Sequence, residues 1–563
     1  MAAREIAGEA TDLEAAAEAR RLPEAARLAA RREVARLSAP GLTPPDRAAA
    51  RAYVEALLAL PWEGGPAPAV DPERVRDALE RRVFGLDEAK RRILERAALL
   101  KLGGGRSRSP TLLLLGPPGT GKTALAAALA QGLGRPLVRV PVGGALGPDI
   151  LGRPRASGGA GPGALAAGLA RAGAAAPVFL VAGVDRVAAD GALALLEVLD
   201  PARRSAFVDR YLGVPIDLSR ALFLATAHHP ADLPPVLERH LETVTLLGYT
   251  AADKVEIARR RLLAEVFEEL GPEAAGRVTV ATDALERLAR AYSPEAGVSR
   301  LRHALGEACR RALARVALAE ADEERIGADD LARLLGEPAR PPEPPRPEVG
   351  VATGLAWTRG GGDLLLVEAV EVDGRGEVAA SDGAGGGGSP GGLYAAVVET
   401  AYGFVRSQAE ALRIDPERLR TRDVRVRISG ADPAAVPPGD EAGAGLAVLL
   451  ALVSLLTDRP VRPDIAVVGG VTLRGAVAPV AGVAERVLAA ERAGRRKVLV
   501  PAASAREAER LGPAVRRALE VVPVERAADA FREGLIDIIV ARGGLEDAIL
   551  GRPAPSGSTT RGG

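Results

Sequence analysis

The spacing of apolar residues changes along the chain, and these changes predict its secondary structure. Over residues 1–60, Ala, Leu and Val recur at helical spacing among Glu and Arg, and residues 71–103 repeat this amphipathic pattern. Residues 110–250 alternate short apolar runs with helical stretches, whereas residues 251–336 show helical spacing without strand-like runs. Residues 349–545 again mix the two patterns.

The short apolar runs of the second region have the length of buried strands. They are Thr111–Leu115, Leu137–Pro141, Val178–Val181 and Ala221–Ala225. Strands that alternate with helices predict a parallel sheet covered on both faces. The expected fold class is therefore α/β, with a parallel-sheet domain, a helical domain after it and a mixed α/β domain at the end.

Breaks in composition place the expected domain boundaries. The segment 337–348 is rich in proline and predicts a stiff linker, and Ser381–Gly392 is rich in glycine and predicts a loop. The parts we expect are a helical lead-in at 1–103, an α/β domain at 104–250, a helical lid at 251–336, the linker, a mixed α/β domain at 349–545 and a disordered tail at 546–563.

Charge and cysteine content exclude several classes of protein. The 74 basic and 73 acidic residues nearly cancel, so there is no electrostatic argument for binding nucleic acid or a membrane surface. The single cysteine, Cys309, excludes an internal disulfide framework. The longest apolar run, Gly445–Leu456, is too short to span a bilayer, and no secretory signal is visible. We expect a cytoplasmic protein without a membrane or nucleic-acid partner.

Residues 116–123 carry the clearest chemical motif. They fit the pattern G-x-x-x-x-G-K-[ST], follow an apolar run and precede the helical stretch Ala124–Leu133, which is the context that a phosphate-binding loop requires. Lys122 is expected to reach the β- and γ-phosphates of ATP, and Thr123 to ligate Mg²⁺. The whole loop is predicted to bind the nucleotide: Gly116, Pro117, Pro118, Gly119, Thr120, Gly121, Lys122 and Thr123.

The strand that normally supplies acidic residues to such a site ends without them. Ala182 and Gly183 follow the run Val178–Val181 directly. Asp185 comes later, on what we expect to be the following helix. It is either a displaced Mg²⁺ ligand or an aspartate that starts the helix.

Taken together, the motifs resemble the Lon family of ATP-dependent serine proteases and, more broadly, the AAA+ ring ATPases. The resemblance implies an AAA+ ATPase domain with a helical lid, followed by a Lon-type proteolytic domain. We expect the chain to lack a counterpart of the family's usual N-terminal substrate-recruiting domain. Segments that carry the resemblance are Leu58–Trp62, Phe84–Leu86, Leu195–Pro201, Phe207–Leu212, Gly248–Thr250, Val351–Thr358, Gly362–Leu365, Ala451–Ser454, Thr472–Gly475, Arg492–Gly494 and Lys497–Pro501.

The residues that match the family's proteolytic dyad lack its chemistry. Gly443 stands where the resemblance places the serine nucleophile, and Ala484 where it places the lysine base. Serine attack needs a hydroxyl and an adjacent base, and these residues supply neither. Asp440 and Thr472 match accessory positions, although hydrogen bonding in a turn and a strand is the favoured explanation for them.

The ATPase part shows similar replacements at positions implied by the resemblance. His228, followed by His229, stands where the first sensor is usually asparagine; the pair is interpreted as loop histidines rather than metal ligands. Ser299 matches the second sensor arginine, with Arg300 one residue away, and Ser157 matches the pore-loop aromatic. Arg239 matches the trans-acting arginine finger, although an ordinary surface arginine is an equal alternative.

These replacements predict a Lon-like pseudoenzyme that binds ATP, hydrolyses it slowly or not at all, and cleaves no peptide by the family mechanism. It would serve as a nucleotide-gated scaffold for a protein client, or as a regulatory subunit of a ring. The ring is expected to be hexameric, with co-assembly of an active Lon-like protease as a further option. The alternative is an active ATP-dependent serine endopeptidase of protein quality control with relocated catalytic residues, for which Ser454, Asp440 and Glu441 are the nearest candidates.

Overall fold

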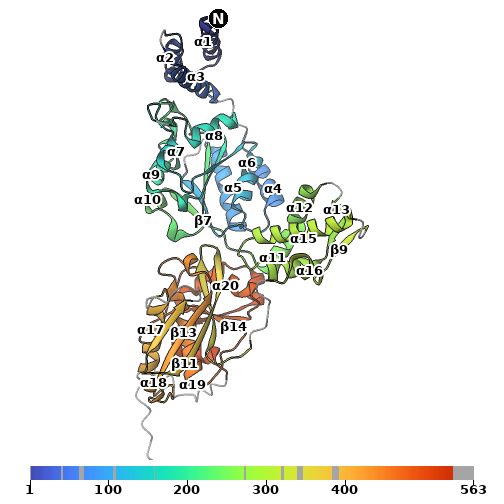
Figure 1. Cartoon of the computed structure of the whole chain (residues 1–563), viewed down its shortest axis with the longest axis vertical. Coiled ribbons are helices and arrows are strands. Elements are labelled where there is room, and N and C mark those ends of the chain that lie inside the picture. Colours follow the sequence, from blue (N-terminus) through green and yellow to red (C-terminus); the bar gives the residue numbers. More distant parts are fainter. Residues whose placement is uncertain are drawn as a thin grey trace, which may run out of the picture. The chain divides into compact units, whose positions relative to one another are not determined.

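The computed structural model of the chain divides into two compact units (Figure 1). One contains residues 1–116 and 121–246, and the other contains residues 117–120 and 247–563. Each unit has hydrophobic cores of its own. The structure describes residues 2–39, 42–62, 69–104, 109–157, 159–271, 274–318, 322–338, 346–382 and 392–536.

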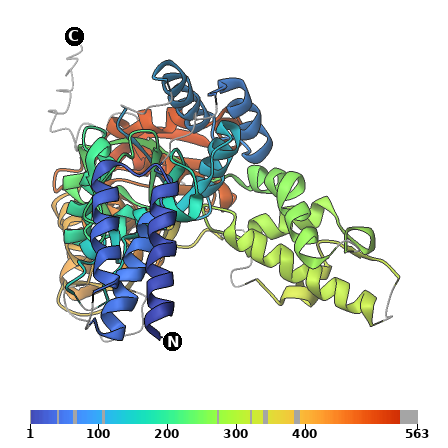
Figure 2. The same cartoon turned by 90° about the horizontal axis from the view of Figure 1, so that it is seen from above.

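The first unit begins with a group of three helices. These are α1 (Ala2–Ala19), α2 (Glu24–Leu37) and α3 (Pro44–Ala59), which run side by side in Figure 2. The Thr43 hydroxyl caps α3 by accepting a hydrogen bond from the Asp46 N–H at 3.3 Å, and proline occupies the first turn. The helical prediction for this region is confirmed.

The central sheet of this unit is parallel, with strand order β2-β3-β6-β1-β7. The four predicted strands are all present. The fifth, β7, was missed because only two of its residues are strongly apolar and only Val244 is buried. The strands are β1 (Thr111–Leu115), β2 (Leu137–Pro141), β3 (Val178–Ala182), β6 (Leu222–Ala227) and β7 (Leu241–Thr245). Since they are parallel, their carboxyl ends meet at one edge, where α/β sheets place ligands.

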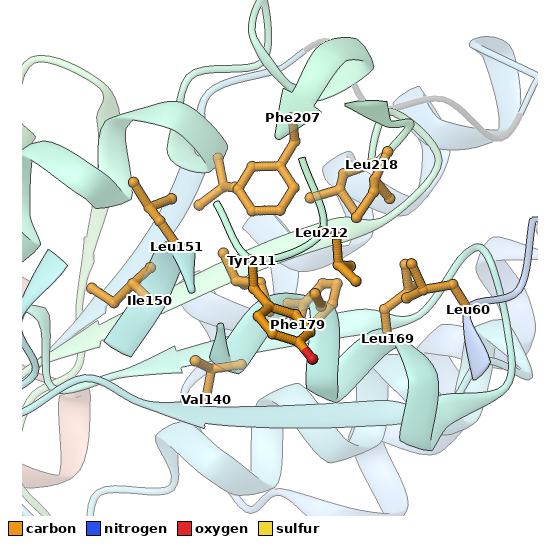
Figure 3. Packing of buried hydrophobic residues seen from close by; sticks show 14 of the residues in the cluster. Leu60, Val140, Ile150, Leu151, Leu169, Phe179, Phe207, Tyr211, Leu212 and Leu218 are labelled. Carbon is orange, nitrogen blue, oxygen red and sulfur yellow. The ribbon is translucent and has the colours of Figure 1, made fainter. Parts of the chain in front are cut away.

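Helices and a short hairpin surround this sheet. They are α4 (Pro72–Arg82), α5 (Asp87–Leu102), α6 (Lys122–Leu133), α7 (Gly147–Leu151), α8 (Ala164–Ala172), α9 (Ala189–Leu199), α10 (Pro235–Glu238), β4 (Phe207–Val208) and β5 (Pro215–Ile216). Phe179 and Phe223 stack on neighbouring strands with ring centroids 5.0 Å apart. Figure 3 shows Phe179 among packed aliphatic side chains that include Leu169 and Leu60.

The second unit begins with a mainly helical region, as predicted. Its helices are α11 (Ala251–Ile257), α12 (Leu263–Leu270), α13 (Ala274–Arg277), α14 (Thr282–Arg287), α15 (Ser299–Ala317) and α16 (Asp330–Leu335), with π-helical turns at Ala258–Leu262 and Leu288–Tyr292. The region also holds a short parallel pair, β8 (Val278–Val280) with β9 (Glu324–Ile326). Strands of three residues are too short to give a period in the sequence, so this pair was not predicted.

A mixed sheet forms the rest of the second unit, as predicted. Its order is β12-β13-β11-β10-β14-β17-β18. The strands are β10 (Val351–Thr358), β11 (Gly361–Asp373), β12 (Val378–Asp382), β13 (Arg422–Gly430), β14 (Ile465–Val467), β17 (Lys497–Pro501) and β18 (Glu520–Val524), and β15 (Gly470–Val471) pairs with β16 (Val477–Ala478) outside it. The α/β fold class is thereby confirmed.

The helices of this part include one that is buried on every side. They are α17 (Ala395–Ser407), α18 (Arg418–Thr421), α19 (Gly445–Thr457), α20 (Val483–Arg492), α21 (Pro513–Ala518) and α22 (Ala527–Gly534). The long apolar run of the sequence forms α19, in the core. None of the described helices has the length and apolar character needed to cross a bilayer.

Three predicted segments lie wholly or partly outside the described residues. They are the linker at 337–348, the glycine-rich loop at Ser381–Gly392 and the tail at 546–563.

Candidate nucleotide site and substituted proteolytic site

The predicted phosphate-binding loop connects β1 to α6. Gly119 and Gly121 have φ angles of 78° and 95°, which glycine adopts without steric cost. The Lys122 side chain is buried, and its ammonium group donates a hydrogen bond to the Gly116 carbonyl. Thr123 is exposed in the first turn of α6. The loop therefore has the backbone form that surrounds a phosphate group, with its lysine at the helix N-terminus.

The segment before α15, which carries the second sensor position, packs on residues 118–119 of the loop. The Val298 N–H donates to the Gly119 carbonyl at 3.3 Å. A Cβ added to Gly297 would lie 2.1 Å from the Pro118 carbonyl oxygen, so only glycine fits there. The Ser299 hydroxyl is 2.6 Å from where a Cβ on Gly119 would lie. A short side chain at position 299 thus lies directly against the loop.

The end of β3 presents no carboxylate to this sheet edge. Ala182 is its last residue and Gly183 follows with φ of 84°. Asp185 lies in a 3-10 turn, Val184–Arg186, rather than on the following helix as predicted. Its Oδ2 accepts the His228 N–H at 2.9 Å and lies 3.0 Å from His228 Nδ1.

Asp185 is therefore engaged by the residue at the first sensor position. Burial raises the pKa of the Asp185 carboxyl, but the hydrogen bonds from His228 outweigh it and leave the pKa below its usual value. His229 is buried, and its Nδ1 accepts the Ala231 N–H at 3.2 Å. Among the described residues, no group of three or more His, Cys, Asp or Glu could hold a metal ion.

The predicted pore loop is attached to the N-terminal helices. Ser157 turns back on its own loop, where its hydroxyl donates to the Pro154 carbonyl at 2.6 Å. Arg155 forms an ion pair with Glu33 of α2 at 2.5 Å, and its guanidinium lies 4.3 Å from the ring centroid of Tyr53 on α3. The hydrogen bond to Glu33 raises the pKa of Arg155. No local pattern indicates this contact, because 122 residues separate Arg155 from Glu33.

Arg239 follows α10 and is exposed. Across the described ranges, no acidic side chain forms an ion pair with it. Its guanidinium is thus available to another molecule.

The two dyad positions of the proteolytic part lie beside a buried arginine. Gly443 is in the 3-10 turn Glu441–Ala444 before α19, and Ala484 is in the first turn of α20. Arg486, two residues further along α20, has no exposed side-chain surface. A Cβ added to Gly443 would lie 2.6 Å from Arg486 Nη1 and 3.0 Å from Nη2. The guanidinium therefore fills the space that any side chain at position 443 would enter.

Three oxygen acceptors hold this guanidinium. Arg486 donates to the Leu355 carbonyl at 2.5 Å, to the Ala481 carbonyl at 3.3 Å and to the Asp440 carboxylate. Asp440 also accepts the Trp357 N–H at 3.1 Å. Burial raises the pKa of Asp440 and lowers that of Arg486, so desolvation outweighs the attraction within the pair. Sequence reasoning named Asp440 as accessory but missed its arginine partner.

The other proteolytic candidates have local structural roles. The Thr472 hydroxyl accepts the Ala476 N–H at 3.1 Å within a tight turn, and the Glu441 carboxylate accepts the Gly439 N–H at 2.7 Å. Ser454 is fully buried in α19; its hydroxyl accepts the Gly350 N–H at 3.0 Å and donates to the Arg459 carbonyl. These contacts explain each residue without catalysis.

Comparisons with known proteins agree with this architecture. Residues 112–249 match the ATPase family associated with various cellular activities (AAA), and residues 325–537 match the Lon protease (S16) C-terminal proteolytic domain. The chain is 39% identical over 562 residues to a Lon protease of Roseiflexus castenholzii, covering 98% of this chain and 68% of that protein. It is 38% identical to a Lon protease of Phenylobacterium zucineum, and this match covers 94% of this chain and 66% of that protein. It is 39% identical to Lon protease 1 of Sorangium cellulosum, and this match covers 89% of this chain and 63% of that protein. The chain thus spans about two thirds of the length of these relatives, and it belongs to the Lon protease family.

Proposed function

We propose that this chain is a pseudoenzyme of the Lon family. It binds ATP and acts in the cytoplasm as a nucleotide-gated scaffold or as a regulatory subunit of a ring. The observation that carries the proposal is the position of Arg486, whose guanidinium occupies the space in front of Gly443.

The residues at the dyad positions oppose proteolysis both chemically and sterically. Covalent catalysis by serine needs a hydroxyl and a base within hydrogen-bond reach of it. Gly443 and Ala484 have neither group, and the Arg486–Asp440 ion pair fills the adjoining space. Ser454 does not replace the nucleophile, because its hydroxyl is buried and bonded to backbone groups.

The phosphate loop supports nucleotide binding, whereas the residues around it oppose fast hydrolysis. Binding uses backbone N–H groups and Lys122, whereas hydrolysis also needs an oriented water and charge stabilisation. Ala182 and Gly183 cannot orient water, and His228 is hydrogen-bonded to Asp185.

The expected Mg²⁺ is poorly supported by the side chains at this edge. Mg²⁺ in nucleotide sites is usually held by one or two carboxylates together with the phosphates. Thr123 offers a hydroxyl, but the strand end offers no carboxylate, and the Asp185 side chain is only 2% exposed. These residues do not fit a conventional magnesium shell.

The ring hypothesis rests on Arg239 and on the pore loop. An exposed arginine without an ion pair in the described chain suits a finger that reaches a neighbour's γ-phosphate, which is worth about 10³–10⁵ in rate in other NTPases. Ser157 offers no aromatic grip, so this subunit would occupy a ring position without pulling polypeptide. We therefore propose a ring, probed first as a hexamer, in which an intact Lon-like protease is the partner and a protein client is the cargo.

The test is a parallel assay of two activities on the purified chain. Calorimetry should show ATP binding that Lys122→Ala weakens, while casein with ATP and Mg²⁺ should remain intact under conditions in which an intact Lon protease degrades it. Casein degradation by the chain would establish the alternative, an ATP-dependent endopeptidase acting on misfolded or regulatory proteins, which the names of the relatives favour. Absence of ATP binding would remove the nucleotide-gated role.

Partnership is tested separately by mixing the chain with an intact Lon-like protease. Size exclusion with mass detection, in ATP and Mg²⁺, should show a joint species, and Arg239→Ala should lower the partner's ATPase rate. Separate elution of the two proteins would remove the regulatory-subunit form and leave the scaffold.

A further inference from the structure

The sheet edge next to the phosphate loop has a cation, Arg186, beside the two positions that lack the expected acidic residues. A Cβ added to Gly183, at the end of β3, would lie 3.4 Å from Arg186 Nη2 and 3.8 Å from Arg186 Nε. A Cβ on Gly143, which follows β2, would lie 3.8 Å from the same Nε. The Arg186 side chain therefore lies against both glycines, within van der Waals contact of any Cβ at position 183 or 143.

Two backbone hydrogen bonds fix the position of Arg186, and its side chain is exposed. Its N–H donates to the Gly183 carbonyl at 3.1 Å, and its carbonyl accepts the Gly144 N–H at 2.7 Å. The side chain is exposed, and no carboxylate within the described part of the chain forms an ion pair with it. The preceding Asp185 is bound to His228 and does not neutralise it.

A guanidinium at this place favours phosphate and disfavours a divalent cation. Arginine binds phosphate oxygens through two parallel N–H donors and is always protonated, whereas it repels Mg²⁺. In the sheet, β3 is separated from β1 by β6 alone, so the two strand ends are roughly 10 Å apart. For Arg186 to bind it, a triphosphate held at the end of β1 would have to extend past β6 toward β3.

We infer that Arg186 takes the place of the divalent cation, so that the chain binds the phosphates of a nucleoside triphosphate without Mg²⁺. This inference rests on the proposed binding of ATP at residues 116–123. It accounts for the joint absence of acidic residues at positions 182 and 183 and the presence of a free cation beside them.

The test is ATP affinity measured by calorimetry with EDTA and, separately, with excess Mg²⁺. For the unmodified chain we expect dissociation constants that agree within about threefold between the two conditions, a difference well under 1.4 kcal/mol. Arg186→Ala should weaken binding in EDTA by about tenfold or more, as expected for a lost charge-assisted hydrogen bond. Arg171→Ala, which removes an exposed arginine at the end of α8, is the matched control and should change neither constant.

Thermal melting of each variant shows that the folded state is retained. ATP binding that appears only with Mg²⁺ would overturn the inference and leave ATP binding intact. Equal affinities of Arg186→Ala and the unmodified chain in EDTA would also overturn it. Absence of ATP binding in both conditions would remove this inference together with the proposed nucleotide site.

Discussion

Arg486 forms a buried ion pair with Asp440 directly beside Gly443. The pair joins α20 to the turn before α19, the two elements that carry the positions matching the family's base and nucleophile. The site is therefore filled by a structural ion pair rather than left as a pocket that lacks two side chains. This difference makes the consequences of substitution predictable.

Restoring the two dyad residues should not restore proteolysis. In Gly443→Ser with Ala484→Lys, the new Cβ at 443 would lie 2.6 Å from Arg486 Nη1. Such overpacking costs about 1–3 kcal/mol, so the double variant should unfold at lower urea concentration and cleave no fluorogenic peptide. Ala442→Ser, which adds a hydroxyl at the exposed neighbouring residue, is the control and should retain full stability. Peptide cleavage by the double variant at unchanged stability would contradict the steric account.

The Arg486–Asp440 pair should behave as a coupled unit in a double-mutant cycle. Asp440→Leu leaves a fully buried guanidinium without its anion and should lower the free energy of unfolding by about 3–5 kcal/mol. Because burial disfavours both charges, the added change Arg486→Met should recover much of that loss. The measurement is urea denaturation of both single variants and the double variant. Additive losses would show that the two side chains do not stabilise each other.

Removing Arg155 should release the pore-loop segment from the N-terminal helices. Arg155→Ala removes the contacts with Glu33 and Tyr53, and hydrogen exchange over residues 152–157 should become faster. The control is Arg153→Ala, whose ion pair with Asp149 is exposed on both sides and is therefore worth little. Equal exchange rates in the two variants would show that Arg155 does not hold the loop.

Lys254 should make the stability of the second unit depend on pH. Its ammonium group is fully buried and donates hydrogen bonds to the Ser293 and Glu295 carbonyls. Burial, with a smaller effect from the positive charge of Arg492, lowers the pKa of Lys254 to about 7. The negative charges of Glu295 and Glu491 oppose this shift. In the unfolded chain the pKa of a lysine is near 10.4. Between about pH 7 and 10, therefore, the unfolded chain holds a proton on Lys254 that the folded chain has lost. The free energy of unfolding should then rise as the pH increases from about 7 toward 10.

Lys254→Met should remove this rise, and Lys101→Met, at an exposed position of α5, should leave it unchanged. Urea denaturation at several pH values between neutral and alkaline measures the slope for each protein. An unchanged slope in Lys254→Met would show that another group causes it.

Local patterns predicted most of the fold, because strands and helices in this chain differ clearly in apolar spacing. The strands β1 and β2 begin and end at the predicted residues. The edge strand β7 and the short pair β8–β9 were missed, since a half-exposed or three-residue strand carries little apolar signal.

The candidate sites were predictable only where a motif is contiguous. The phosphate loop is one run of eight residues, whereas Arg486 meets Asp440 across 46 positions and Arg155 meets Glu33 across 122. A charged residue on a helix is normally exposed, so nothing in the local sequence marked Arg486 as buried. Only the folded chain brings these partners together.

The most direct test of the central claim is the mass of the intact chain after reaction with a fluorophosphonate probe, which labels activated serines. The account predicts no added mass in the presence of ATP and Mg²⁺, while an intact Lon protease in the same reaction gains one label. A single label on this chain that disappears in Ser454→Ala, or in any other serine variant, would contradict the account, because it would reveal an activated nucleophile.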